Sequence, residues 1–226
     1  MALLLSCFTT AASAANVFRA QVTINRGSKP ADDNSNVVVW LTPQDQPPLT
    51  APAEPRHFRL VQKNKKFEPH LLVIPIGSVV EFPNEDPFFH NVFSLYKGKK
   101  FDLGLYESGS SRSVRFDRPG VSFVFCNIHP QMNASIVVMT TPYYGISGKS
   151  GEVELKDVPN GKYRLQVWFE GASAEELQAA AREVTVGPDT AVASVRLHQL
   201  FEGTMPHKNK FGQDYPADHS YQPHQR

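Results

Sequence analysis

The segment VSFVFCNIHPQM carries three side chains that could bind one metal ion. Cys126 stands at the end of an apolar run, His129 follows three residues later, and Met132 follows three residues after that. Thiolate, imidazole and thioether together form a soft ligand set that suits copper. Because the spacing is short, a single loop can wrap all three side chains around one ion.

A fourth ligand has to come from another part of the chain. His90 lies in NEDPFFHNVFS, directly before an apolar, strand-like run. A β-sandwich can bring this loop and the Cys126 loop to the same end. Two imidazoles and a thiolate, with a long and weak thioether bond, are the ligands of blue-copper electron-transfer sites. The sequence therefore predicts one mononuclear copper site on His90, Cys126, His129 and Met132.

Other uses of Cys126 fit the sequence less well. A structural zinc site is expected to have four Cys or His ligands. A dinuclear copper centre needs a second Cys on the same loop, and a multicopper oxidase needs several His pairs, whereas the core offers only His57, His70, His90 and His129. A cysteine nucleophile needs a positioned His base, and His129 is too close in sequence for that. The remaining alternative is a buried, inert Cys with His and Met nearby by chance.

The motif Cys-x2-His-x2-Met after an apolar strand, with an upstream His-Asn pair, resembles the cupredoxin family, and its short loop is similar to that of the amicyanin-like members. The resemblance covers about residues 60–140. It implies a Greek-key β-sandwich or barrel that binds one type 1 (blue) copper ion through the four residues named above. It also implies that Asn91, next to the first His, hydrogen-bonds across to the Cys-bearing loop and clamps the site.

The function that this resemblance implies is one-electron transfer by a protein that is not an enzyme. In cupredoxins the second His of the ligand loop lies near the surface, and His129 has that place here. Redox partner proteins would then dock near His129, Pro130, Phe88 and Phe89. Two alternatives stay open: a copper-binding carrier or chaperone that holds Cu(I), and a structural or docking module whose copper site is degenerate.

The rest of the chain has to build the elements that position these residues. Hydrophobic residues make up 41% of the sequence and charged residues 20%, which is ordinary for a globular protein. The net charge of +1 offers no strong field, so nucleic acid is not expected as a partner. Short strand-like runs separated by turn residues recur across 57–140, and this pattern is typical of a Greek-key sandwich. We therefore expect an all-β protein with its cupredoxin domain at 57–140.

The segment GKSGEVELKDVPNGKYRLQVWF resembles the carboxypeptidase regulatory-like (transthyretin-like) β-sandwich family. The residues that match the family pattern are Asp157, Val158, Pro159, Gly161, Tyr163, Leu165 and Val167. Because the first strands of that family would lie before the copper block, we expect a discontinuous second sandwich made of 17–45 and 141–198, with a short helix at 173–183. The rival arrangement has two consecutive domains, with 17–56 extending the cupredoxin sheet.

Both ends of the chain are predicted to lie outside the folded domains. Residues 1–14 contain a short apolar run and an A-x-A-like site, as in a secretory signal peptide, which predicts a periplasmic or secreted protein. The alternative is an apolar first strand. No other apolar run is long enough to cross a membrane, so no integral span is expected. Residues 199–226 are polar and are expected to be extended or disordered.

Overall fold

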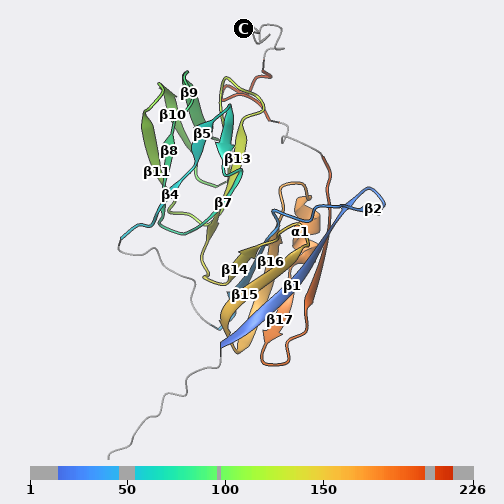
Figure 1. Cartoon of the computed structure of the whole chain (residues 1–226). Helices are drawn as coiled ribbons and strands as arrows, with labels where there is room; N and C mark the ends of the chain where they lie inside the picture. The colour runs from blue at the N-terminus through green and yellow to red at the C-terminus, as the bar shows by residue number, and fades with distance from the viewer. Residues whose placement is uncertain (1–14, 46–53, 96–97, 202–206, 216–226) are drawn as a thin grey trace, which may run out of the picture. The chain divides into compact units, whose positions relative to one another are not determined.

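The computed structural model describes residues 15–45, 54–95, 98–201 and 207–215 (Figure 1). The described residues are mostly β-strands with one short helix, and this confirms the expected all-β class. None of their helices has the length and apolar character that a membrane crossing requires. The predicted signal peptide lies outside the described residues.

The chain divides into two compact units. The first, which we call the flanking unit, consists of Met1–Pro47 and Tyr143–His198. The second, which we call the site unit, consists of Pro48–Pro142 and Gln199–Arg226. The expectation that 57–140 and the two flanking segments are separate folding domains stays a prediction.

The flanking unit contains two sheets. One has the order β15-β1-β18 with β2 beside β1, formed by Glu152–Pro159, Ala15–Arg26, Ala193–His198 and Lys29–Pro30. The other has the order β14-β3-β16-β17, formed by Tyr144–Ile146, Val38–Pro43, Gly161–Trp168 and Arg182–Val186. Apolar side chains from both sheets, including Phe18 and Leu165, meet in one core, as alternation along each strand requires.

Strand pairing in the flanking unit joins segments from both sides of the metal motif. β1 pairs with β15 and β18, and β3 pairs with β14 and β16. Within the described residues, neither β1 nor β3 pairs with a strand of the site unit. This pairing favours the discontinuous sandwich over the rival arrangement in which 17–56 extends the copper sheet.

The helix predicted at 173–183 is present but shorter. α1 spans Ala174–Ala180, and the hydroxyl of Ser173 accepts the N–H of Glu176 at 3.1 Å, which caps the start of the helix. The helix ends early because Arg182–Val186 form β17 and pair with β16.

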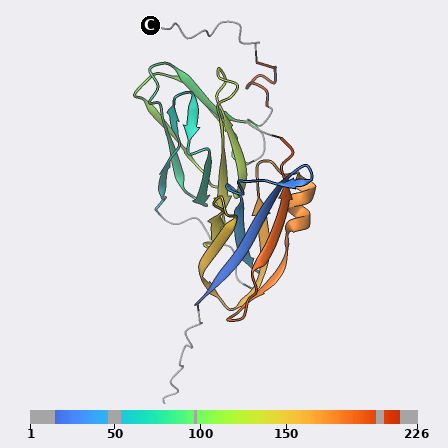
Figure 2. The same ribbon diagram turned by 45° about the vertical axis from the view of Figure 1, so that its right-hand side comes forward.

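The site unit is a sandwich of a five-stranded and a three-stranded sheet (Figure 1 and Figure 2). The larger sheet has the order β10-β9-β12-β13-β7, formed by Phe101–Tyr106, His90–Ser94, Gly120–Phe125, Asn133–Met139 and Leu71–Pro75. The smaller sheet has the order β11-β8-β4, formed by Ser111–Arg115, Val79–Pro83 and His57–Arg59. A separate hairpin joins β5 (Val61–Lys63) to β6 (Lys66–Glu68).

Strands β9 and β12 position the predicted ligands. The two strands are antiparallel neighbours, with Phe93 opposite Phe125. β9 begins at His90 and β12 ends one residue before Cys126, so both residues lie at the same end of these two neighbouring strands. Because side chains alternate between the two faces of a strand, His90 and Cys126 face away from Phe93 and Phe125, on the side of the sheet where Cys126 joins the core cluster of the site unit.

Candidate metal centre

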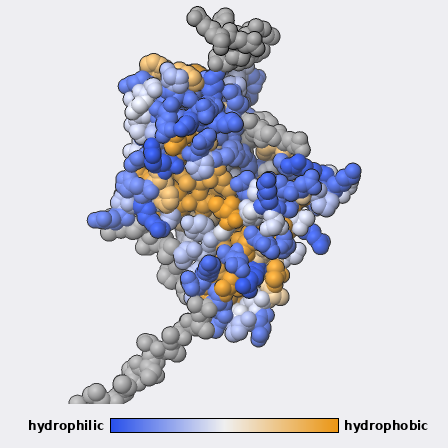
Figure 3. All heavy atoms as spheres, in the orientation of Figure 1, coloured by the Kyte–Doolittle hydropathy of each residue, from blue (hydrophilic) through white to orange (hydrophobic). Residues whose placement is uncertain are grey.

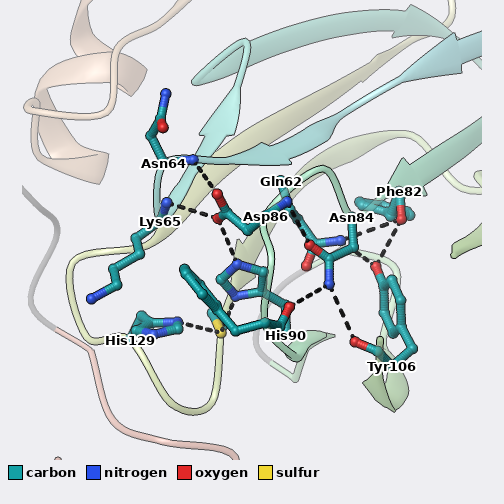
Figure 4. A network of polar contacts seen from close by, with 11 residues as sticks. Gln62, Asn64, Lys65, Phe82, Asn84, Asp86, His90, Tyr106 and His129 are labelled. Atoms are coloured by element: carbon teal, nitrogen blue, oxygen red, sulfur yellow. Dashed lines mark hydrogen bonds and ion pairs between the residues drawn. The ribbon is translucent and has the colours of Figure 1, made fainter. Parts of the chain in front are cut away.

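Side chains from two separate segments of the chain converge at this end of β9 and β12 (Figure 4). His90, Cys126 and His129 each offer one ligand atom, and these atoms all lie within 4.8 Å of one another. The sulfur of Cys126 lies 3.6 Å from Nδ1 of His90 and 3.6 Å from Nδ1 of His129. Ligand atoms bonded at roughly 2.0–2.3 Å to one ion are separated by about this distance at a near-tetrahedral angle. The donor set therefore fits a transition-metal ion.

Met132 belongs to the same loop as Cys126 and His129. The N–H of Cys126 donates to the carbonyl of Met132 at 3.1 Å, and the N–H of Met132 donates to the carbonyl of His129 at 3.0 Å. The side chain of Met132 is fully buried in the same apolar cluster as Cys126. The structure thus brings His90, Cys126 and His129 together and closes the loop that carries Met132 by backbone hydrogen bonds.

The environment of Cys126 is dry and offers several hydrogen-bond donors. Burial raises the pKa of the Cys126 thiol above its ordinary value, and the backbone N–H groups of Ile128, Asn91 and His129 oppose that rise in part. A free thiolate is therefore disfavoured, whereas a bound cation would stabilise one at this position. This electrostatic setting suits a metal ligand better than a free nucleophile.

Asp86 is a functional candidate that the sequence analysis missed. Its Oδ2 lies 2.8 Å from Nε2 of His90, and both side chains are buried. The backbone N–H groups of Asn64 and Lys65 donate to the same carboxylate at 2.6 and 2.9 Å. Both residues have positive φ, which aims consecutive N–H groups of the β5–β6 turn at Asp86. The sequence signal was the acidic residue four positions before His90.

Hydrogen bonding keeps Asp86 charged. Burial raises the pKa of this carboxyl group, but the hydrogen bonds from Lys65, His90 and Asn64 outweigh that effect, and the net pKa is lower than the ordinary value. A carboxylate at Nε2 accepts its proton and so leaves the lone pair of Nδ1 facing Cys126. In metal sites, such an outer partner fixes the tautomer and the ring orientation of a His ligand.

A buried polar network supports the loop that carries Asp86 (Figure 4). The side chain of Asn84 accepts the N–H of Asp86 at 3.1 Å and donates to the carbonyl of Phe88 at 2.8 Å. The hydroxyl of Tyr106 donates to the carbonyl of Phe82 at 2.8 Å, and burial raises the pKa of this phenol far above its ordinary value. These neutral groups fix the backbone on both sides of the Asp86–His90 pair.

Asn91 makes a different contact from the one that the resemblance implied. Its side-chain amide donates to Oδ1 of Asp102 at 2.8 Å, and its own Oδ1 accepts no hydrogen bond from the described residues. Alternation along β9 explains the difference, because Asn91 faces the side of the sheet opposite to His90. The clamp is therefore not a direct bond from the Asn91 side chain to the Cys126 loop, and a role of Asn91 in metal binding stays a prediction.

The two Phe residues before His90 have different surroundings. The ring of Phe88 packs against the imidazoles of His90 and His129, with centroid distances of 5.1 and 5.7 Å. Phe89 is 52% exposed, and Ile128 is 47% exposed. Figure 3 shows apolar atoms at the end of the site unit near β9 and β10. Phe88 therefore shields the cluster from solvent. Phe89 and Ile128, which directly precede His90 and His129 in the sequence, are exposed apolar side chains.

Several solved structures that are similar to this chain are copper proteins. A copper-containing nitrite reductase from Thermus scotoductus SA-01 is 28% identical, with a TM-score of 0.37, and the match covers 42% of this chain and 26% of the reductase. A purple cupredoxin from Nitrosopumilus maritimus is 25% identical, with a TM-score of 0.33, and the match covers 37% of this chain and 98% of the cupredoxin. A reduced amicyanin variant is 21% identical, with a TM-score of 0.34, and the match covers 44% and 98%.

These likenesses carry no functional conclusion by themselves, because every one of the three TM-scores lies below 0.5. The chain also spans only about a quarter of the nitrite reductase that it matches. No protein-family model matches the sequence, and no curated protein matches it. The chain is an all-β protein with a His-Cys-His cluster that could hold a metal ion, in which His90 and Cys126 are buried and His129 is half-buried.

Proposed function

We propose that the protein is a type 1 copper protein that carries single electrons and is not an enzyme. The observation that carries this proposal is the buried thiol of Cys126, which lies 3.6 Å from the Nδ1 atoms of two His residues. His90, Cys126, His129 and Met132 would hold one copper ion, which supplies a one-electron couple when bound. Loop hydrogen bonds and dense packing restrict movement of these side chains, so electron transfer needs little rearrangement.

The exposure of the two imidazoles favours an electron route through His129. His90 is fully buried and paired with Asp86, whereas His129 is half-buried between exposed positions of the loop. Redox partner proteins would dock near His129, Pro130, Phe88 and Phe89. Of these, Phe88 would support the docking surface by packing against the imidazoles of His90 and His129. A small apolar contact of this kind suits brief encounters between electron carriers. The signal-like N-terminus supports a periplasmic or secreted location.

The visible absorption and electron paramagnetic resonance spectra of the copper-loaded full chain test this proposal. A thiolate and two imidazoles around copper should give an intense visible band and a narrow copper hyperfine splitting. A matched sample of the variant His57→Gln should behave in the same way, because His57 is exposed and lies outside the cluster. A colourless copper form with the signal of square-planar nitrogen and oxygen ligands would contradict the proposal.

Copper should also stabilise the fold. At a free copper concentration 100 times the dissociation constant, tight binding to the native state is expected to raise the melting temperature by about 5–10 °C. Differential scanning calorimetry with and without copper measures this shift. An unchanged melting temperature would favour the alternative in which the copper site is degenerate.

A further inference from the structure

Residues 207–215, which we call the tail segment, fold onto the site unit, although the sequence predicted an extended or disordered tail (Figure 1). The ring of His207 stacks on Phe125, with a centroid distance of 4.1 Å and an interplanar angle of 23°. The tail segment is also ordered within itself, because the N–H of Asn209 donates to the carbonyl of Gln213 at 2.9 Å. The tail segment therefore makes ordered contacts, and the expectation of an extended or disordered tail stays a prediction for residues 202–206 and 216–226, which lie outside the described residues.

Two hydrogen bonds from the tail segment reach consecutive residues of the ligand loop. The hydroxyl of Tyr215 donates to the carbonyl of Cys126 at 2.8 Å. The N–H of Lys210 donates to Oδ1 of Asn127 at 3.0 Å. The N–H of Cys126 already donates to the carbonyl of Met132 within the loop. With the bond from Tyr215, both backbone polar groups of Cys126 are hydrogen-bonded.

Lys210 also connects the ligand loop to the strands that carry the other end of the cluster. Its Nζ lies 2.8 Å from Oδ2 of Asp102, whose Oδ1 accepts the side-chain amide of Asn91. The resulting chain of contacts runs from Asn91, next to His90, through Asp102 and Lys210 to Asn127, next to Cys126. A link between the two halves of the cluster therefore exists, and the tail segment is part of it.

Aromatic packing holds Tyr215 in place. Nε2 of His207 lies 3.1 Å from the hydroxyl of Tyr215, and the two rings meet edge to face at 5.2 Å. Because His207 in turn stacks on Phe125, the residue before Cys126, the three rings form one aromatic cluster beside β12. Each contact is weak, but contacts that share the same groups reinforce one another.

We infer that the tail segment fixes the Cys126–Asn127 peptide through Tyr215 and Lys210, and that Tyr215 is thereby a positioning residue for the thiolate ligand. The positional part of this inference, that the tail segment holds the backbone at Cys126, applies to the metal-free chain. Its effect on a bound metal ion rests on the proposed function. With the carbonyl of Cys126 held by Tyr215 and the side chain of Asn127 held by Lys210, the Cys126 side chain can take fewer directions. That restriction sets the orientation of the sulfur relative to the two imidazoles.

Amide hydrogen exchange in the metal-free full chain tests the positional part. In Tyr215→Phe, the amides of Cys126 and Met132 should exchange about two to ten times faster than in the native protein, which is the range expected for the loss of one hydrogen bond. Tyr144→Phe is the matched control, because Tyr144 belongs to the flanking unit and its variant should leave these rates unchanged. Unchanged rates in both Tyr215→Phe and the double variant His207→Ala/Tyr215→Phe would overturn the inference.

A second readout separates a positioning role from a purely structural one. In the copper-loaded chain, Tyr215→Phe should shift the thiolate-to-copper absorption band and the reduction potential, whereas Tyr144→Phe should leave both unchanged. Identical spectra and potentials in Tyr215→Phe and in the native protein would overturn the role toward the ligand. A native chain that binds no copper would instead refute the proposed function and would leave the exchange comparison to decide whether the tail segment holds the peptide.

Discussion

Cys126→Ser should abolish the intense visible band of the copper-loaded protein and weaken copper binding by more than about 100-fold. Outer-shell partners alone are worth about 10–100-fold in metal affinity, and Cys126 is a proposed ligand. A hydroxyl oxygen is a harder donor than a thiolate and does not give the sulfur-to-copper transition. Absorption spectroscopy and a competition titration against a copper chelator measure the two effects.

The serine variant should still fold, which makes the comparison informative. Ser is close to Cys in shape, and the loop is closed by backbone hydrogen bonds that the substitution leaves intact. The metal-free melting temperature should therefore stay close to that of the native chain, and His57→Gln serves as the control that retains the band. Native-like copper affinity in Cys126→Ser would show that the ion binds elsewhere.

The convergence of His90, Cys126 and His129 could be predicted because it depends on local chain properties. The spacing of Cys126 and His129 in one loop fixes their proximity. An apolar run before Cys126 and another after His90 predict two buried strands, and a sandwich can bring the end of one and the start of the other to the same end of the fold. Alternation then decides which side chains point inward. None of these steps requires knowledge of contacts elsewhere in the chain.

The supporting residues could not be predicted in this way, because their partners are remote. Asp86 is held by the N–H groups of Asn64 and Lys65, which act only because the β5–β6 turn adopts positive φ and lies against the next loop. Tyr215 and Cys126 are 89 positions apart in the chain. The composition of the C-terminal region indicates only a polar, solvated segment. It does not predict that the hydroxyl of Tyr215 donates to the carbonyl of Cys126.

In the flanking unit, too, local features could be predicted from the sequence and contacts between remote residues could not. The helix expected at 173–183 could be predicted because it depends on local contacts, such as the bond between Ser173 and Glu176 at its start. The pairing of β1 with β15 and β18 joins residues on opposite sides of the site unit in sequence, and only a resemblance to a whole family pattern suggested it. That resemblance to the carboxypeptidase regulatory-like family stays a prediction.

Asp86→Asn should weaken copper binding by about 10–100-fold, although Asp86 is not a proposed ligand. The carboxylate accepts three N–H groups, from Asn64, Lys65 and His90. An amide has only one acceptor oxygen, so its NH₂ group must face one of these donors. The negative charge of the acceptor is also lost, so the hydrogen bond that orients Nδ1 of His90 toward Cys126 becomes weaker. A copper competition titration measures the loss, and Asp117→Asn, which removes an exposed carboxylate paired with Lys99, is the charge-matched control.

Acid titration of the metal-free protein provides a test that does not depend on copper. The folded-state pKa of Asp86 lies below the ordinary value of 3.8. A group with a lowered pKa stabilises the fold fully above its unfolded-state pKa, and this contribution is lost as pH falls through the folded-state pKa. Asp86→Asn should therefore be less stable than the native chain at neutral pH, and the difference in the free energy of unfolding should shrink below about pH 3.8.

The Asp117→Asn control should retain most of the native acid dependence, because ion pairs at half-exposed positions contribute little to stability. Urea unfolding at several pH values measures all three proteins. If Asp86→Asn kept both the native copper affinity and the native acid dependence, Asp86 would not orient His90, and packing of Phe88 against the imidazole would have to fix that ring instead.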